Sequence, residues 1–101
     1  MFLFIIMLMQ IKEIGDSKNV SIKGKITDKS GTRTFSRMGS QGRVAMAVVD
    51  DGTGSIQLTL WDDEIDKIEL GDEVEIENGY IKEFRGEKQL STGRDGTIKK
   101  L

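Results

Sequence analysis

The most restrictive feature of this sequence is a run of alternating apolar and polar side chains at residues 55–61. Ile56, Leu58 and Leu60 fall on one side of an extended segment, because side chains in a β-strand alternate with a period of two. The intervening polar residues fall on the opposite side. The pattern predicts a strand with one buried face and one polar face.

Trp61, the only tryptophan of the chain, lies on the polar side of this predicted strand. An exposed aromatic ring among small polar side chains is suited to stacking on unpaired nucleic-acid bases. The alternative is that Trp61 closes one end of a barrel or covers the next helix. Strand parity by itself leaves both interpretations open.

A second alternating segment occupies residues 20–27, with its apolar side chains on one side and its lysines on the other. Gly24 lies inside this segment and indicates a bulge or a sharp bend, as in a strand that curls to close a barrel. Residues 28–42 follow and are rich in Ser, Thr, Gly and Arg. They are predicted to form a long mobile loop.

The residues at 43–50 are apolar on both parities, which is typical of a central strand. The Asp-Gly-Thr-Gly sequence at residues 51–54 predicts a hairpin turn that joins this strand to the strand at residues 55–61.

A short helix is predicted at residues 62–68, where acidic residues at the start favour the helix dipole. Residues 73–77 alternate again, and Asn78 and Gly79 then interrupt the pattern as a candidate bulge. The bulge decides where Tyr80 points. Without it Tyr80 is a core residue, and with it Tyr80 faces outward.

The last predicted strand is residues 88–92, which follows a loop at residues 83–86, and the residues beyond Gly93 are expected to form a basic tail. The order is therefore three strands, a short helix and two strands. This order predicts an all-β fold, a five-stranded OB-fold barrel with a short helix between the third and fourth strands.

The composition excludes several kinds of chemistry. The chain has 101 residues, enough for one domain, and contains neither cysteine nor histidine. Disulfides, thiol catalysis, zinc fingers and imidazole acid-base chemistry are therefore excluded. No nucleophile–base pair, calcium loop or other metal set is visible, so we expect a protein that is not an enzyme and has no cofactor.

The formal net charge is −2, but the charges are sorted by segment. Residues 20–46 carry a net +5 and residues 81–101 a net +3, whereas residues 62–77 carry a net −8. Such a distribution is compatible with a basic groove on an acidic body, because local potential matters more than total charge. The alternative is that these are ordinary solvated faces.

The chain is predicted to comprise an apolar N-terminal extension at residues 1–10, an OB-fold domain at residues 11–98 and a short basic tail at residues 99–101. Residues 1–8 are either an over-extended gene start or a real segment that packs on the barrel. The apolar run is shorter than the about 20 residues that span a bilayer, and it lacks the features of a signal peptide. We expect no membrane partner and a cytoplasmic location.

Four short motifs together resemble archaeal single-stranded DNA-binding proteins, which are relatives of the DNA-binding domains of replication protein A. The resemblance extends over about residues 11–98. The motifs are Asp-Gly-Thr-Gly at residues 51–54, Leu-Thr-Leu-Trp at 58–61, Glu-Asn-Gly-Tyr at 77–80 and Phe-Arg-Gly at 84–86.

The resemblance implies non-enzymatic binding of single-stranded DNA in replication, repair or recombination. Aromatic residues of that family stack on bases, and the matching positions are Trp61, Tyr80 and Phe84. Phe35, in the predicted long loop, either clamps a base or anchors the loop. The remaining candidate residues would contact phosphates or bases: Lys23, Lys25, Arg33, Arg37, Arg43, Lys82, Arg85, Lys88, Gln89 and Ser91.

Two alternatives to DNA binding stay open at the level of the sequence. One is an RNA-binding OB module of the anticodon-binding type. The other is a scaffold OB domain that binds only protein partners, such as other subunits of a replication protein A-like complex; the pI near 5.2 is compatible with it.

Overall fold

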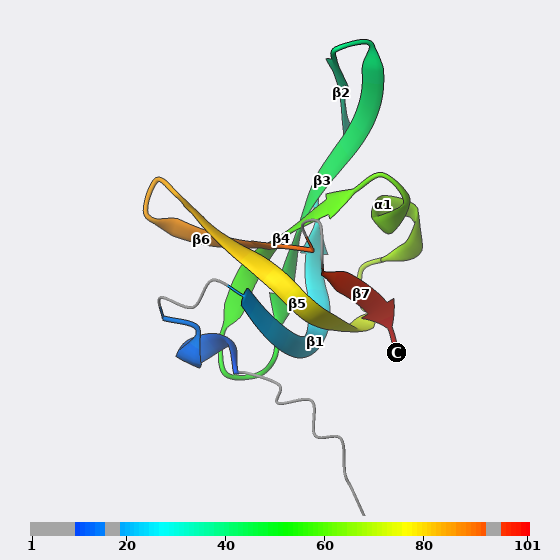
Figure 1. Ribbon diagram of the computed structural model, residues 1–101. Coiled ribbons are helices and arrows are strands. Elements are labelled where there is room, and N and C mark those ends of the chain that lie inside the picture. Colours follow the sequence, from blue (N-terminus) through cyan, green and yellow to red (C-terminus); the bar gives the residue numbers. More distant parts are fainter. Residues whose placement is uncertain (1–9, 16–18, 93–95) are drawn as a thin grey trace, which may run out of the picture.

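Five strands close into a ring, as the sequence predicts (Figure 1). In spatial order they are β1 (Asn19–Lys29), β3 (Ser40–Asp50), β4 (Ser55–Trp61), β6 (Glu87–Ser91) and β5 (Glu73–Phe84), and β5 pairs with β1 to complete the ring. All of these pairs are antiparallel except β4–β6, which is parallel. This computed structural model describes residues 10–15, 19–92 and 96–101, without the side chains of Arg37 and Phe84.

Four shorter elements complete the described structure. The 3₁₀ helix η1 (Ile11–Glu13) precedes the ring, and α1 (Asp63–Lys67) lies between β4 and β5, the third and fourth ring strands along the chain. The strands β2 (Arg33–Arg37) and β7 (Thr97–Lys100) pair with β3 and β5 respectively. No helix among the described residues is long and apolar enough to cross a membrane. Of the predicted extension at residues 1–10, residues 1–9 lie outside the described residues.

The prediction of a long mobile loop at residues 28–42 was wrong over most of its length. Residues 33–37 form β2, which pairs with the first half of β3, and this hairpin extends away from the barrel (Figure 1). Met38 and Gly39 form its turn with φ angles of 52° and 83°, both in the left-handed region. Most side chains of the hairpin are exposed, so it lacks the alternation of buried and exposed residues by which a strand is identified in a sequence.

The expectation of a basic tail after Gly93 also missed a strand. β7 pairs with the first half of β5, and Lys100 forms a 3.4 Å ion pair with Asp72. The side chain of Ile98 is 7% exposed and joins the core. One apolar residue in a strand of four is too short a pattern to be recognised in the sequence.

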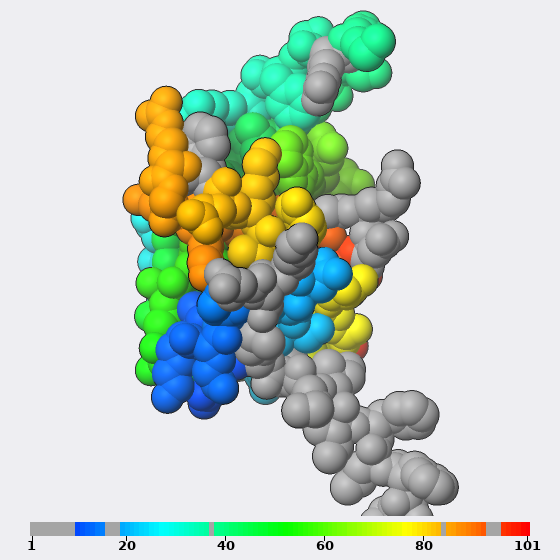
Figure 2. Space-filling model, turned by 60° about the vertical axis from the view of Figure 1, so that its left-hand side comes forward, coloured from blue at the N-terminus to red at the C-terminus, as the bar shows by residue number. Residues whose placement is uncertain are grey.

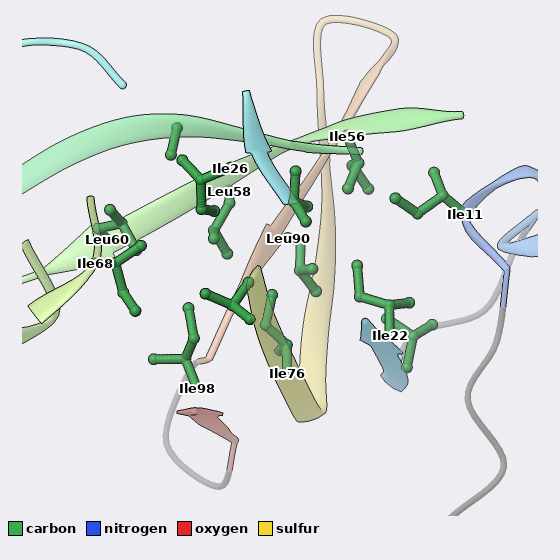
Figure 3. Packing of buried hydrophobic residues seen from close by; sticks show 14 of the residues in the cluster. Ile11, Ile22, Ile26, Ile56, Leu58, Leu60, Ile68, Ile76, Leu90 and Ile98 are labelled. Atoms are coloured by element: carbon green, nitrogen blue, oxygen red, sulfur yellow. The ribbon is translucent and has the colours of Figure 1, made fainter. Parts of the chain in front are cut away.

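The inside of the ring is filled by branched aliphatic side chains (Figure 3). Ile22 and Ile26 of β1, Leu58 and Leu60 of β4 and Leu90 of β6 have no exposed surface. These are the residues on the apolar side of each alternating segment. The parity predicted from the sequence is therefore confirmed for β1 and β4.

Gly24 lies where β1 changes partners, since its neighbour Lys25 is in register with both Glu73 of β5 and Asp50 of β3. A Cβ atom on residue 24 would lie 2.8 Å from the carbonyl oxygen of Asp50 and 2.8 Å from a methyl group of Val49. Glycine thus allows the close approach that closes the barrel. Gly24 itself is not at a bulge. In the β1–β5 ladder the extra residue is on β5, opposite Ser21, and in the β1–β3 ladder it is Thr27 of β1.

The predicted bulge in β5 is confirmed. Val20 pairs with Gly79 and Ile22 pairs with Ile76, so β5 holds one more residue than β1 over this stretch. Asn78 takes up the extra length with a φ angle of 53°. Ile76 before the bulge and Ile81 after it both face the core, and Tyr80 is turned outward with 49% of its surface exposed.

We predict that Leu58→Ala lowers the free energy of unfolding by about 2–5 kcal/mol, because it removes a fully buried side chain from the centre of the barrel. Leu70→Ala is the matched control, since Leu70 is 64% exposed, and it should change stability by no more than about 0.5 kcal/mol. Urea unfolding followed by circular dichroism measures both. Equal losses in the two variants would contradict this assignment of the core.

Candidate nucleic-acid interface

One continuous surface is formed by the outward-facing side chains of β3, β4 and β6, and we call it the outer surface. The strand register places its members in rows across the sheet. Val44 of β3 lies opposite Trp61 of β4. Thr59 of β4 lies between Met46 of β3 and Ser91 of β6, and Gln57 lies between Val48 and Gln89 in the same way.

The apolar character of β3 on both parities now has a physical explanation. Ala45, Ala47 and Val49 point into the core, whereas Val44, Met46 and Val48 point outward and are half-buried. The outward set forms an apolar floor for the outer surface. Sequence reasoning identified the central strand but did not assign these residues to the site.

Trp61 is held at one end of the outer surface by three contacts. Its indole Nε1–H donates a hydrogen bond to Ser91 Oγ at 3.1 Å, and its backbone N–H donates to Glu64 Oε1 at 3.0 Å. The Phe35 ring meets the indole edge to face, with 6.0 Å between ring centroids and an 88° angle between planes. Trp61 remains 39% exposed, so its ring is oriented but still accessible.

Phe35 reaches Trp61 because glycine occupies the position opposite it on β3. Phe35 pairs with Gly42, and a Cβ atom on residue 42 would lie only 2.3 Å from the phenyl ring. The ring therefore lies across β3 toward β4, with 39% of its surface exposed. Phe35 therefore lies in a strand and packs against Trp61, whereas the sequence predicted that it lies in a long loop.

Tyr80 belongs to the same surface. It pairs with Ser91 across the β5–β6 ladder, and Ser91 accepts the hydrogen bond from Trp61. The side chains of directly opposed residues lie on the same face of a sheet. Trp61, Phe35 and Tyr80 are thus exposed aromatic groups that share one side of the barrel.

Two predicted site residues lie partly outside the description. The backbones of Arg37 and Phe84 end β2 and β5 respectively, but their side chains are not among those described. Phe84 is followed by the β5–β6 turn, where Arg85 and Gly86 have φ angles of 51° and 81°. Positive φ at both central residues is the geometry of a two-residue type I′ hairpin turn. Arg85 is exposed in this turn.

Two cationic side chains lie beside the outer surface. Arg33 of β2 is in register with Val44, and Lys82 of β5 is in register with Gln89. Both are exposed. Arg33 lies on the β2 side of the aromatic residues and Lys82 on the β5 side.

Gln89 and Lys88 have partners of their own. Gln89 donates from Nε2 to Oε1 of Gln57 at 3.1 Å, so the two amides lie side by side on the outer surface. The ammonium group of Lys88 donates to the backbone carbonyl of Gly15, and it therefore joins β6 to the N-terminal segment.

Lys23 and Lys25 are not brought to this surface. Lys25 is in register with Asp50, six residues along β3 from the partner of Trp61, which is about 20 Å at strand spacing. The two lysines share a shallow depression with Asp50, Asp51 and Glu73. The nearby carboxylates make this depression a poor site for phosphate.

Arg43 was predicted to contact phosphate, but its guanidinium group is already paired. It forms a bidentate interaction with Asp66, with distances of 2.7 and 3.2 Å, and also donates to the carbonyl oxygen of Asp62 at 3.2 Å. The hydrogen bond and the charge of Arg43 lower the pKa of Asp66 below its usual value. Arg43 therefore fastens β3 to α1.

The carboxylate of Asp62 has a related structural task. Asp62 is the N-cap residue of α1, but its side chain makes no capping bond to the helix. It accepts a hydrogen bond from the backbone N–H of Arg43 at 3.0 Å instead. The unusual backbone of Asp62, with φ at 47°, turns the carboxylate toward β3.

Sequence reasoning missed the side chains that support Trp61 from behind. Glu64 accepts from the Trp61 backbone with Oε1 and from Thr92 Oγ1, at 2.8 Å, with Oε2. Lys29 Nζ donates to the carbonyl oxygens of Ile65 and Ile68 at 2.7 and 2.8 Å. These contacts hold α1 against the end of β4. Trp61 and Glu64 are three residues apart, but the partners in the other contacts are 28–39 residues apart, so no local spacing in the sequence predicts those contacts.

The chemistry of the outer surface is that of a binding site. It offers aromatic rings, an apolar floor, amide and hydroxyl groups and flanking cations. In the described part of the chain, no group of three or more His, Cys, Asp or Glu side chains is placed to hold a metal ion.

Comparison with known proteins places this geometry in context. Residues 20–94 match the family described as "OB-fold nucleic acid binding domain". Replication factor A of Methanothermobacter thermautotrophicus is 38% identical over 91% of this chain, and the single-stranded DNA binding protein Ssb of Saccharolobus solfataricus is 30% identical over 75% of it. The matched regions are 13% and 51% of the lengths of those two proteins.

Solved structures agree with the fold. A domain of replication protein A from Methanococcus maripaludis superposes with a TM-score of 0.76 at 26% identity, covering 94% of this chain and 96% of that domain. The OB domain of Ta0387 from Thermoplasma acidophilum gives a TM-score of 0.78 at 24% identity, covering 93% and 86% of the two chains.

We predict that Ser91→Ala loosens the indole of Trp61, since it removes the acceptor of the Nε1–H hydrogen bond. The single indole N–H signal in the NMR spectrum should shift, and its exchange with solvent should accelerate. Ser55→Ala, six residues from Trp61 on the same strand, is the control and should leave the signal unchanged. An unchanged indole signal in Ser91→Ala would show that this hydrogen bond does not orient the ring.

Proposed function

Because the chain belongs to the family of OB-fold nucleic acid binding domains, we propose that it binds single-stranded DNA with little sequence preference, and that it is not an enzyme. The observation that carries this proposal is the aromatic group of Trp61, Phe35 and Tyr80 on one side of the barrel. Every base offers a flat π-face, so stacking on such rings tolerates any sequence.

The strand would lie along the outer surface, with bases against the aromatic rings and the apolar floor. Ser91, Gln57 and Gln89 provide hydroxyl and amide groups that can bond to base edges or sugars. The phosphates would meet Arg33 on the β2 side and Lys82 on the β5 side of this surface. Arg85 in the β5–β6 turn is a further candidate, and Arg43 is left out because Asp66 already pairs with it.

The net charge of −2 is compatible with this arrangement, because the charges are sorted by segment. Acidic residues are concentrated at residues 62–77, in α1 and the first part of β5. Association with a polyanion responds to the potential near the groove rather than to the total charge.

A role in replication, repair or recombination follows from the named relatives and is part of the proposal. Two of them are named replication factor A and single-stranded DNA binding protein, and both are longer than the matched region. The proposal therefore includes further OB-fold subunits or domains as partners. Comparison of ribo- and deoxyribo-oligomers tests the RNA alternative, since RNA alone offers the 2′-hydroxyl.

We predict that oligothymidine quenches the fluorescence of Trp61 and that an equal amount of duplex does not. Stacking on the exposed indole changes its emission, and the signal is specific because Trp61 is the only tryptophan. Tyr80→Ala should weaken binding, measured by the same titration, by about 1–3 kcal/mol. A flat titration with both ligands at low salt would favour the scaffold alternative.

We further predict that affinity falls as salt rises, with a log–log slope near −2 if about three phosphates are neutralised at about −0.7 each. Replacing Arg33 and Lys82 together with Gln should flatten the slope by about 1.4 and weaken binding to all sequences alike. Lys67→Gln, on the acidic α1, is the control and should leave the slope as it is. A slope that Arg33 and Lys82 do not influence would remove them from the phosphate path.

A further inference from the structure

A hollow of about 660 Å³ lies at the end of the outer surface that is farthest from Trp61. One wall is the N-terminal segment that contains Ile11 and Ile14, and the other is the β5–β6 turn near Lys88. In Figure 2 the blue segment η1 and the orange turn lie on the same side of the molecule, with green residues of β4 beside them. The volume is within the range of about 300–1,000 Å³ that small-molecule sites occupy.

The hollow is continuous with the outer surface. Val48 and Gln57 line it, and both belong to the row that includes Gln89. Gln89 is two residues from Ser91, which holds the indole of Trp61. Gln57 lies four residues from Trp61 on β4, which is about 13 Å at strand spacing. Stacked bases are about 3.4 Å apart, so about three bases fit between Trp61 and the hollow.

The lining combines the groups that a nucleotide needs. Apolar surface comes mainly from the half-buried Val48, with the small exposed parts of Ile11 and Ile14 beside it, and it suits the flat face of a base. The hydroxyl of Ser55 and the amide of Gln57 can bond to a base edge. The ammonium groups of Lys12 and Lys88 outnumber the one lining carboxylate, that of Glu87, so the hollow favours a phosphate.

The wall formed by the N-terminal segment is fastened to the barrel. The backbone N–H of Ile11 donates to Asp51 Oδ2 at 2.7 Å, and that of Lys12 donates to Thr53 Oγ1 at 3.4 Å. Lys88 supplies a third tie through the carbonyl of Gly15. Burial would raise the pKa of Asp51, but hydrogen bonds from Thr53, Ile11 and Gly54 outweigh it and lower this pKa.

We infer that this hollow is a further nucleotide subsite, which takes a base and phosphate of the same strand beyond those at the aromatic residues. The inference rests on the proposed function and extends it to the N-terminal segment. The strand would then run from Trp61 along β4 to Ser55, and the length bound would include the nucleotide in the hollow. Its occupant is an unpaired nucleotide rather than a peptide, because the hollow continues the surface proposed to hold bases.

NMR titration of the full chain with oligothymidines of about 4 to about 16 nucleotides, the range of OB-fold site sizes, tests this directly. Short oligomers should shift the indole N–H signal of Trp61 and leave the backbone amides of Ile14 and Gly15 in place. Longer oligomers should also shift those two amides. If the indole signal shifts but the two amides never do, the subsite is wrong and the proposed function stands. If no signal shifts at any length, the proposed function itself fails.

A variant pair gives an independent test. Lys12→Glu reverses an exposed charge at the hollow and should weaken the binding of long oligomers about tenfold, a change of about 1.4 kcal/mol, while short oligomers bind within about twofold of wild type. Lys67→Glu makes the same change in charge on exposed α1 and should not reduce the gain in affinity with length. The subsite would be overturned if Lys12→Glu lowered the affinity for short and long oligomers equally. It would also be overturned if Lys12→Glu and Lys67→Glu reduced the gain in affinity with oligomer length to the same extent.

Discussion

The structure depends on the double pairing of β1. This strand pairs with β5 through Lys25 and with β3 from Lys25 onward, and this change of partner closes the sheet into a ring. The closure requires the backbone of β3 to pass so near Gly24 that a Cβ atom there would meet the carbonyl of Asp50. Once the ring is closed, every alternating strand has one face in a sealed core and the other in solvent, so the polar face of β4 becomes a surface available to a ligand.

Three different features of the fold bring aromatic side chains to the outer surface. Trp61 follows the simple parity of β4, whereas Tyr80 faces outward only because the bulge at Asn78 reverses the parity of β5. Phe35 reaches the site by lying over Gly42 from a strand outside the ring. The three side chains come from separate segments, and the register of β2, β3, β4, β6 and β5 brings them to one side.

The basic residues show why charge in a sequence is a weaker guide than aromatic parity. Arg33, Arg43 and Lys25 all belong to the same basic stretch, yet they have three different surroundings. Arg33 is exposed and is separated from Trp61 by Val44, Arg43 is bonded to Asp66, and Lys25 lies near Glu73 and Asp50. A long side chain takes its role from the charges that folding places near it, and those charges come from distant parts of the chain.

The sequence by itself determined the barrel, the buried positions of β1 and β4, and the place of Trp61 on the polar side of β4. These properties follow from the two-residue period of strands and from burial of aliphatic side chains, which act between near neighbours and leave a regular pattern. It also indicated the bulge at Asn78, since an Asn-Gly pair favours positive φ. Tertiary structure alone decided the strands β2 and β7, the contact between Phe35 and Trp61, the ion pair of Arg43 with Asp66 and the hollow beside Lys12. Each of these depends on contacts between residues far apart in the chain, and no local period records such contacts.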